Sequence, residues 1–434
     1  MNTRLICAFV AALFIIGCKK DPAPPPITPE TPFSVTVNNE YGPLQARLAI
    51  FLSGEDGETL VYRELPGHAT TVVEAPNSGT DDRFDCTVAK IVAIDAPGSG
   101  VRDTIVTLTT YTSLQHGETI NLRNIFPYLT TDLNVHFTNV TSVDTVIVPD
   151  GLTFEQPQAS NNFNGRYRVQ HTGKIWLRAR VNGQQMWRFI LFDKVSEPQL
   201  DATLDAAVML PIFAAPKNIA LPFTAAWEYK VDGIVDTSGF QFLALGDLLR
   251  APGGAVPVFS DVDIYEPITN DVFDPGPKPY SGFRVRLSGA DPNPGGYTYY
   301  SDDFYADIPA TAPVPAFDLQ PTTLSDNRLV ATQCIGNFDA LVFSRTRPGT
   351  PNIGWEVYTA PASGVVAYRL PDVPDALGNE FPALKNYDFG GNVRARAEEY
   401  KKISAYETVL RHLLQNDDPL WRAKAGYLGR EEAQ

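Results

Sequence analysis

Short segments in which apolar and polar residues alternate, each bounded by turn-forming residues, recur along the first third of the chain. In RFDCTVA, for example, Phe84, Cys86 and Val88 alternate with polar residues. A period of two places alternate side chains on opposite faces of a β-strand. Similar segments are FSVTVNNEY, LQARLAIFL, ETLVYREL, ATTVVEA and DTIVTLTTY. The pattern predicts a mainly β protein that starts with an immunoglobulin-like β-sandwich module over residues 33–127.

The clearest single element is a predicted β-hairpin in KIWLRARVNGQQMWRFILF, residues 174–192. Asn182-Gly183 is the preferred dipeptide of a two-residue type I′ turn, because both of its residues need a positive φ. With this turn Val181 pairs with Gln184, and the register divides the side chains between two faces. One face is aliphatic except for Arg188, and it predicts a core surface. The other predicts a cation–π ladder and carries Trp176, Arg178, Arg180, Gln185, Trp187 and Phe189.

The length of 434 residues suggests about three domains. We expect a second β-sandwich module over residues 128–210. A β-rich region follows over residues 211–390, and a proline-rich connection at 308–321 is a candidate site for splitting it. Tandem sandwich modules are therefore the predicted architecture.

The C-terminal segment, residues 391–434, differs from the rest of the chain. Residues 392–415 contain no Gly or Pro. Apolar side chains recur there at steps of three and four, which predicts an amphipathic helix. Packing against the last domain is the first interpretation, and binding of a partner is the alternative. The apolar positions are Val393, Ala397, Tyr400, Ile403, Tyr406, Leu410 and Leu413.

The N-terminus consists of one positive charge at Arg4 followed by the apolar run LICAFVAALFIIG. A membrane-spanning helix needs roughly 20 apolar residues, and this run is shorter, as in a secretory signal. It ends at Ile15-Ile16-Gly17-Cys18, which resembles the lipobox of bacterial lipoproteins. The resemblance implies that residues 1–17 are removed and that Cys18 receives diacylglycerol. Residues 18–32 then form a lipidated start and a spacer with six prolines.

Lys19-Lys20-Asp21 after the cysteine looks like the surface-export signals of Bacteroidetes lipoproteins, although those usually carry more acidic residues. The resemblance implies a lipid anchor in the outer membrane and leaves open which side of that membrane the protein faces. Architectures of this kind often accompany nutrient capture or adhesion.

Composition and motifs exclude several classes of protein. The net charge of −15 disfavours binding to nucleic acid, which needs clustered Lys and Arg. The G-x-S-x-G, H-E-x-x-H, P-loop and G-x-G-x-x-G motifs are all absent from the sequence, and no cofactor is indicated. Beyond Cys18 the chain has Cys86 and Cys334, for which two separately buried thiols are favoured over a disulfide.

Two stretches are candidate ligand surfaces besides the Trp176, Arg178 and Trp187 face. GGYTYYSDDFYAD places aromatic rings beside carboxylates, a combination that suits a sugar ring and equally suits an ordinary hairpin. SDVDIYEPITNDVFD is a weaker candidate for a calcium site, because hard cations need several oxygen ligands. The aromatic residues are Tyr297, Tyr299, Tyr300, Phe304 and Tyr305, and the candidate calcium ligands are Asp261, Asp263 and Glu266.

The sequence thus predicts a lipid-anchored envelope protein with a non-catalytic role in binding, adhesion or structure. Its expected partners are the membrane, through the anchor, and a glycan or another envelope protein. Two alternatives stay open: an envelope hydrolase that acts on polysaccharide, and an accessory component of an outer-membrane uptake or assembly complex.

Overall fold

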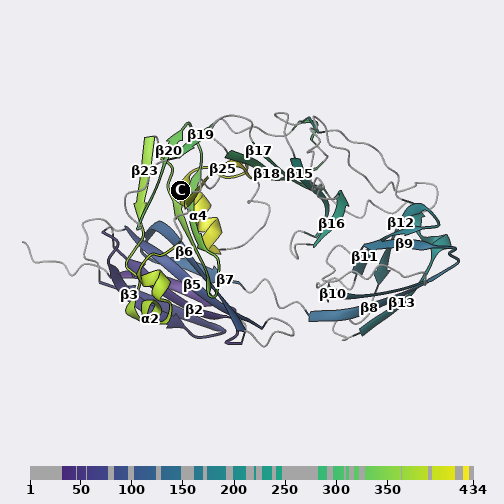
Figure 1. Cartoon of the computed structure of the whole chain (residues 1–434), viewed down its shortest axis with the longest axis horizontal. Helices are drawn as coiled ribbons and strands as arrows, with labels where there is room; N and C mark the ends of the chain where they lie inside the picture. Colours follow the sequence, from purple (N-terminus) through teal and green to yellow (C-terminus); the bar gives the residue numbers. More distant parts are fainter. Residues whose placement is uncertain are drawn as a thin grey trace, which may run out of the picture.

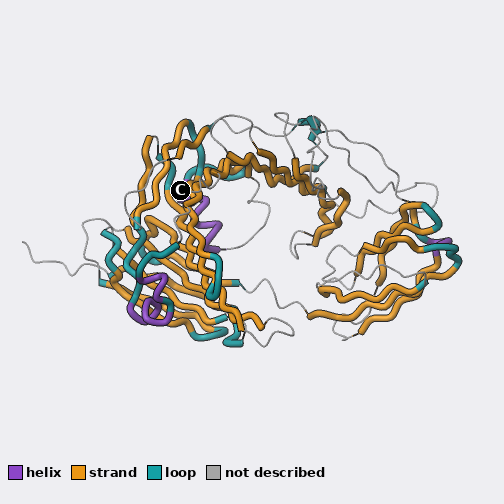
Figure 2. The backbone as a smooth tube through the Cα atoms, in the orientation of Figure 1, coloured by secondary structure: helices purple, strands orange, loops and turns teal. Residues whose placement is uncertain are grey.

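A computed structural model shows that the chain is mainly β, as its alternating segments predict (Figure 2). The structure describes residues 32–44, 46–54, 56–76, 83–95, 102–123, 129–147, 161–169, 174–191, 199–211, 219–220, 227–236, 241–246, 282–290, 297–306, 309–311, 317–321, 328–362, 364–389, 393–415 and 424–429.

One twelve-stranded sheet runs through most of the molecule (Figure 1). Its strands come from both ends of the chain. In spatial order they are β16 (Gln241–Gly246), β15 (Trp227–Asp236), β17 (Phe283–Ala290), β18 (Tyr297–Tyr305), β25 (Lys424–Gly429), β24 (Val393–Tyr400), β21 (Ala340–Arg347), β22 (Asn352–Thr359), β6 (Arg102–Gln115), β5 (Arg83–Asp95), β2 (Arg47–Ser53) and β3 (Thr59–Leu65).

A parallel pairing in the middle of this sheet joins segments that are far apart in the sequence. Residues 105–111 of β6 pair with residues 352–358 of β22. Strands from the first predicted module and from the region after residue 329 therefore share one sheet. The module boundaries near residues 127, 210 and 390 stay a prediction, but four strands of the first module, β2, β3, β5 and β6, share a sheet with strands from later regions.

Two smaller sheets cover the part of the large sheet that contains β6 and β22. One contains β4 (Ala69–Ala75), β1 (Phe33–Asn39) and β7 (Glu118–Leu122), and the helix α4 (Tyr406–Gln415) lies beside it. The other contains β19 (Asp318–Pro321), β20 (Leu329–Ile335) and β23 (Gly364–Arg369), followed by the short helices α2 (Asp375–Glu380) and α3 (Pro382–Lys385).

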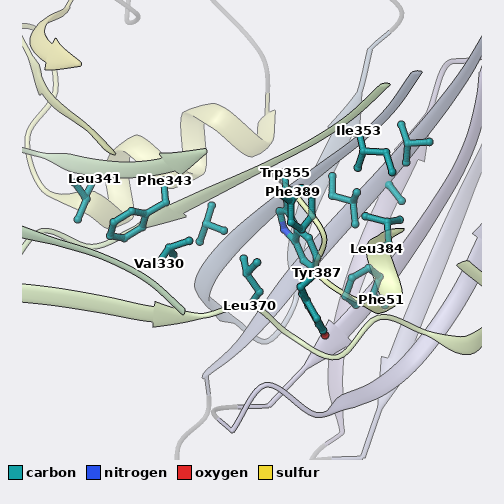
Figure 3. Packing of buried hydrophobic residues seen from close by; sticks show 14 of the residues in the cluster. Phe51, Val330, Leu341, Phe343, Ile353, Trp355, Leu370, Leu384, Tyr387 and Phe389 are labelled. Carbon is teal, nitrogen blue, oxygen red and sulfur yellow. The ribbon is translucent and has the colours of Figure 1, made fainter. Parts of the chain in front are cut away.

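Strands between these two layers are buried on both faces. In β2, Leu48, Ile50 and Leu52 belong to the core beneath β1 and α4. Ala49 and Phe51 belong to a second core, which also contains residues of β20, β22 and the segment 370–389 (Figure 3). The run RLAIFLS is therefore almost continuously buried instead of alternating, as expected for a strand covered on both sides.

The described strands between residues 129 and 211 form two further sheets that enclose a separate core. In Figure 1 these strands lie apart from the larger body. One sheet contains β10 (Asn162–Val169), β8 (Leu129–Thr138) and β13 (Gln199–Asp205); the other contains β14 (Leu210–Pro211), β12 (Gln184–Leu191), β11 (Lys174–Val181) and β9 (Val143–Ile147), with a 3-10 turn at Ala206–Val208.

The predicted hairpin is confirmed in its register. Val181 pairs with Gln184 and Trp176 with Phe189, and both turn residues have positive φ, 51° at Asn182 and 78° at Gly183. Leu177, Ala179 and Val181 are buried in the core, as the aliphatic face predicts. Arg188, the non-aliphatic residue of that face, donates a hydrogen bond to the carbonyl oxygen of Val208 at 3.1 Å.

Replacing Gly183 with alanine is expected to destabilise the protein by about 1 kcal/mol, because an L side chain is strained at positive φ. Nothing lies within 4 Å of the added Cβ, so steric clash makes no contribution. The free energy of unfolding by urea measures the effect. Gly354→Ala is the matched control, since Gly354 also has open space around it but no left-handed φ. An equal loss at both glycines would contradict the explanation.

The predicted helix over residues 392–415 is wrong for its first half. Residues 393–400 form β24, and α4 begins only at Tyr406. The stretch RARAEEY also alternates with period two: Ala397 faces one core while Tyr400 faces the other. Pairing with β21 and β25 therefore prevails over the helical propensity of Ala, Arg and Glu. The helix packs against the core that contains β1 and β5.

Candidate functional site

The aromatic strand β18 lies inside the large sheet, between β17 and β25. Its alternate residues point to opposite sides, and Tyr299 is fully buried. The prediction that Tyr299 contributes to a ligand surface is therefore wrong, because its ring has no access to a ligand. The structure describes Tyr297 only as part of the strand backbone.

Tyr300 takes part in a buried polar cluster with residues of β24. Its hydroxyl donates to Oε1 of Glu398 at 2.9 Å, and the hydroxyl of Tyr400 donates to Oε2 at 2.7 Å. The Nε of Arg396 lies 2.6 Å from Oε1, and Glu398 is completely buried. Burial and the neighbouring Glu398 carboxylate raise the pKa of Tyr300 well above its usual range, so the phenol stays a neutral donor.

The last residues of β18 are engaged with neighbouring strands. Asp303 is buried and forms an ion pair with Lys401, whose ammonium lies 5.5 Å from the centre of the Tyr305 ring. Burial, followed by hydrogen bonding to Asp303, raises the pKa of Tyr305 above its usual range. The arrangement holds Lys401 by charge and by a cation–π contact.

On the other side of β18, Arg284 binds Asp302 through two hydrogen bonds of 2.8 and 2.6 Å. The same guanidinium lies 5.7 Å from the centre of the Phe304 ring. Asp302 and Asp303 thus have separate basic partners, as expected for adjacent residues of a strand. This division does not suit the paired carboxylates of a glycosidase.

In the hairpin, Trp176 lies opposite Phe189 and Arg178 opposite Trp187. This pairing places the three predicted contact residues Trp176, Arg178 and Trp187 on one face of β11 and β12. That face as a ligand surface stays a prediction.

Several predicted site residues lie outside the described residues, namely the lipidation site Cys18 and the candidate calcium ligands Asp261, Asp263 and Glu266. Among the residues that the structure describes, no group of three His, Cys, Asp or Glu side chains is placed to hold a metal ion.

The two remaining cysteines are separate and buried, as expected from the sequence. Cys86 in β5 belongs to the core beneath β1 and α4, and Cys334 in β20 belongs to the second core. Burial raises the pKa of the Cys334 thiol to about 11 and raises the pKa of Cys86 further. Both groups are therefore protonated at neutral pH, which makes them poor nucleophiles.

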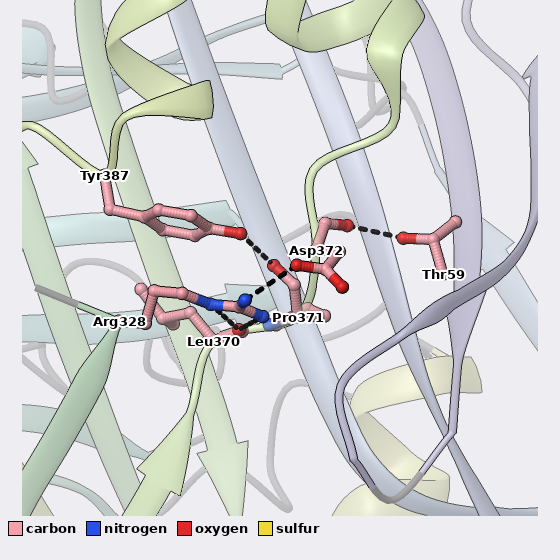
Figure 4. Close-up of polar contacts among 6 residues, drawn as sticks. All are labelled: Thr59, Arg328, Leu370, Pro371, Asp372 and Tyr387. Atoms are coloured by element: carbon pink, nitrogen blue, oxygen red, sulfur yellow. Dashed lines mark hydrogen bonds and ion pairs between the residues drawn. The ribbon is translucent and has the colours of Figure 1, made fainter. Parts of the chain in front are cut away.

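A second polar cluster, which the sequence did not reveal, is centred on Arg328 (Figure 4). Its guanidinium donates to the carbonyl oxygen of Leu370 at 2.8 Å and pairs with Asp372 at 2.7 Å. The carbonyl of Asp372 accepts a hydrogen bond from Thr59 in β3, and its N–H donates to Gly57 at 2.6 Å. The cluster therefore ties the segment 370–373 to the loop between β2 and β3.

Tyr387 completes the Arg328 cluster. Its hydroxyl donates to the carbonyl of Pro371 at 2.9 Å, and its ring centre lies 5.0 Å from the guanidinium carbon of Arg328. These contacts join residues of the first predicted module to residues near the C-terminus. In the contacts described, the hydrogen-bond donors of the cluster are bound by backbone carbonyl oxygens or by a carboxylate, so we interpret the cluster as stabilising the fold.

One pair of side chains has the residue types of a hydrolase nucleophile and its base. The hydroxyl of Ser34 lies 3.3 Å from Nδ1 of His116, in an exposed position at the start of β1. Nucleophilic catalysis needs a third group that orients the base. Within the described part of the chain, the only hydrogen bond seen at the His116 ring is the one to Ser34.

No helix among the described residues is long and apolar enough to cross a membrane.

Comparison with protein-family models gave no match, and no curated protein matches the chain. Among solved structures, the tip fimbrial protein Mfa3 from Porphyromonas gingivalis, with a C-terminal truncation, is 10% identical. The match covers 37% of this chain and 81% of that one, with a TM-score of 0.17. A fimbrial assembly protein from Parabacteroides distasonis is 9% identical over 42% of this chain and 94% of its own, with a TM-score of 0.14. With such TM-scores, neither structure determines the fold or the role of this chain.

Proposed function

We propose that this chain is a lipid-anchored protein of the cell envelope with a non-catalytic role in binding or assembly. The lipobox-like Ile15-Ile16-Gly17-Cys18 carries the proposal, because it stands just before a proline-rich stretch and a β body that begins at Phe33. Residues 19–32 would then hold the body away from the bilayer. The non-catalytic role is supported by the polar clusters around Glu398 and Arg328, in which the charged side chains bind other residues of the fold.

Replacing Cys18 with alanine is expected to abolish membrane association, because the thiol is the attachment point for diacylglycerol. Cell fractionation measures the loss, and mass spectrometry of the N-terminal peptide identifies the modification. Cys7→Ala is the matched control and is expected to leave the anchor in place. An unmodified Cys18, or a mature chain that still begins at Met1, would show that the protein is not anchored in this way.

For the binding role, we propose the hairpin face with Trp176, Arg178 and Trp187 as the contact surface. Large aromatic and Arg side chains dominate binding energies, so Trp187→Ala should weaken binding at least about tenfold. The measurement is the affinity for envelope polysaccharides on an array and for envelope proteins after cross-linking. Gln184→Ala, at the exposed turn, is the control. If both variants bind like the unmodified chain, this face is not the contact surface.

A further inference from the structure

β25, the last strand among the described residues, lies between β18 and β24 and connects them into one sheet. It is antiparallel to both neighbours. Six residues of β25 pair with β18, and five pair with β24. Unless side-chain contacts specify its register, so short a strand could shift along its neighbours and still form backbone hydrogen bonds.

One row of residues crosses all three strands. Gly426 is opposite Tyr300 on one side and opposite Glu398 on the other. Two steps between neighbouring strands span about 10 Å. The Tyr300 hydroxyl nevertheless reaches Oε1 of Glu398 at 2.9 Å, over the backbone of β25. A side chain at position 426 would point to the same face and lie between the two groups, whereas glycine leaves the path open.

The contact over Gly426 involves a buried charge, which makes it sensitive to register. Glu398 is completely buried, and Tyr300, Tyr400 and Arg396 supply its polar partners. If β25 shifted by one residue, its side chains would turn to the other face. If it shifted by two, Lys424 or Leu428 would stand between Tyr300 and Glu398. A buried carboxylate that loses a partner is strongly destabilising, so each shifted arrangement is penalised.

The position at which β25 begins is also defined by side chains of its two neighbouring strands. Lys424 is opposite Asp302 on one side and Tyr400 on the other. The next residues of the outer strands, Asp303 and Lys401, contact each other directly in an ion pair. Beyond Lys424 the two outer strands are therefore joined by their own side chains.

We propose that the Tyr300–Glu398 hydrogen bond over Gly426 fixes the register of β25. It thereby fixes how β25 joins the two parts of the twelve-stranded sheet. Buried polar groups that select one register among several are the best-attested use of such groups. The inference concerns the assembly of the fold and is independent of the proposed envelope function.

Hydrogen exchange of the mature full-length chain tests the proposal. In Tyr300→Phe the hydroxyl is lost while the ring stays. Amides of residues 424–429 are expected to exchange at least about tenfold faster, as for loss of a hydrogen bond to a charged group. Tyr368→Phe is the matched control: Tyr368 also donates to a carboxylate, Asp85, at 2.7 Å, but from β23. Exchange of residues 424–429 should stay unchanged in this control.

Cross-linking then measures the register itself. Ser301 and Ala425 are opposite each other, so Ser301→Cys with Ala425→Cys should form a disulfide in the native register. Adding Gly426→Val is expected to reduce the yield of this disulfide severalfold. Unchanged exchange in Tyr300→Phe, equal acceleration in both tyrosine variants, or an undiminished disulfide with Gly426→Val would each overturn the proposal.

Discussion

Replacing Trp355 with alanine is expected to destabilise the protein by about 3–5 kcal/mol, the usual cost of removing a buried aromatic side chain. Trp355 is 1% exposed. Its ring stacks on Tyr387 with 6.3 Å between centroids, and it meets Phe389 edge-on at 6.1 Å (Figure 3). Its indole N–H donates to Oγ1 of Thr110 at 2.9 Å. The variant loses all of these contacts at the junction of β22 and β6, and urea unfolding measures the loss.

Two controls separate packing from hydrogen bonding at this position. Trp355→Phe keeps an aromatic ring, so its loss of stability should be clearly smaller than that of the alanine variant. Thr110→Val leaves the ring but removes the acceptor of the indole N–H, together with the hydrogen bond between Thr110 and Thr87 at 2.7 Å, and it should cost about 1–3 kcal/mol. A loss below about 1 kcal/mol for Trp355→Ala would mean that residue 355 does not occupy the core.

Replacing Arg396 with methionine is expected to cost about 3–5 kcal/mol, because it removes the ion pair between Arg396 and the buried Glu398 carboxylate. Methionine preserves much of the apolar length of the arginine side chain, so the charge is the main change. Glu398 is fully buried, so bulk water does not solvate its carboxylate in the unmodified chain. Thermal or urea unfolding of the purified chain measures the effect.

A variant of an exposed ion pair serves as the control, and a double variant tests whether the buried charge causes the loss of stability. Arg347→Met removes an ion pair with Asp388 at 3.7 Å whose side chains are 40% and 61% exposed, and it should cost no more than about 1 kcal/mol. Adding Glu398→Leu to Arg396→Met removes the buried carboxylate itself and should recover part of the lost stability. If Arg347→Met and Arg396→Met prove equally mild, Glu398 does not depend on Arg396.

Local sequence patterns predicted the elements whose structure depends on neighbours in the sequence. Asn182-Gly183 determines its own backbone angles, so the hairpin register followed from two residues. The strand β5 was predicted for the same reason, since Phe84, Cys86 and Val88 face one core. The helix prediction failed over residues 393–400, where period two and helical steps were both present and the pairing partners β21 and β25 decided the outcome.

Long-range pairing and the use of both sheet faces could not be predicted in this way. No local signal indicates that β6 pairs with β22, because nothing in either segment specifies its partner. The aromatic rings beside carboxylates in this stretch made Tyr299 a candidate for a ligand surface, but the structure buries Tyr299. Glu398 was missed since it stands in the charged run RARAEEY, where its only signal is the alternation with alanine and tyrosine.

The order of the strands along the chain has a consequence for how the protein must be made. β6 is complete by residue 115, whereas the strand that pairs with its outer edge ends at residue 359. β18 and β24 are then joined by residues 424–429, which follow all the other strands of this sheet in the sequence. Until then the backbone groups along these edges lack their partners, and exposed strand edges favour aggregation. Such long-range pairings also slow folding. A chain truncated before residue 424 is therefore expected to aggregate more readily than the full chain, because β18 and β24 keep their facing edges exposed.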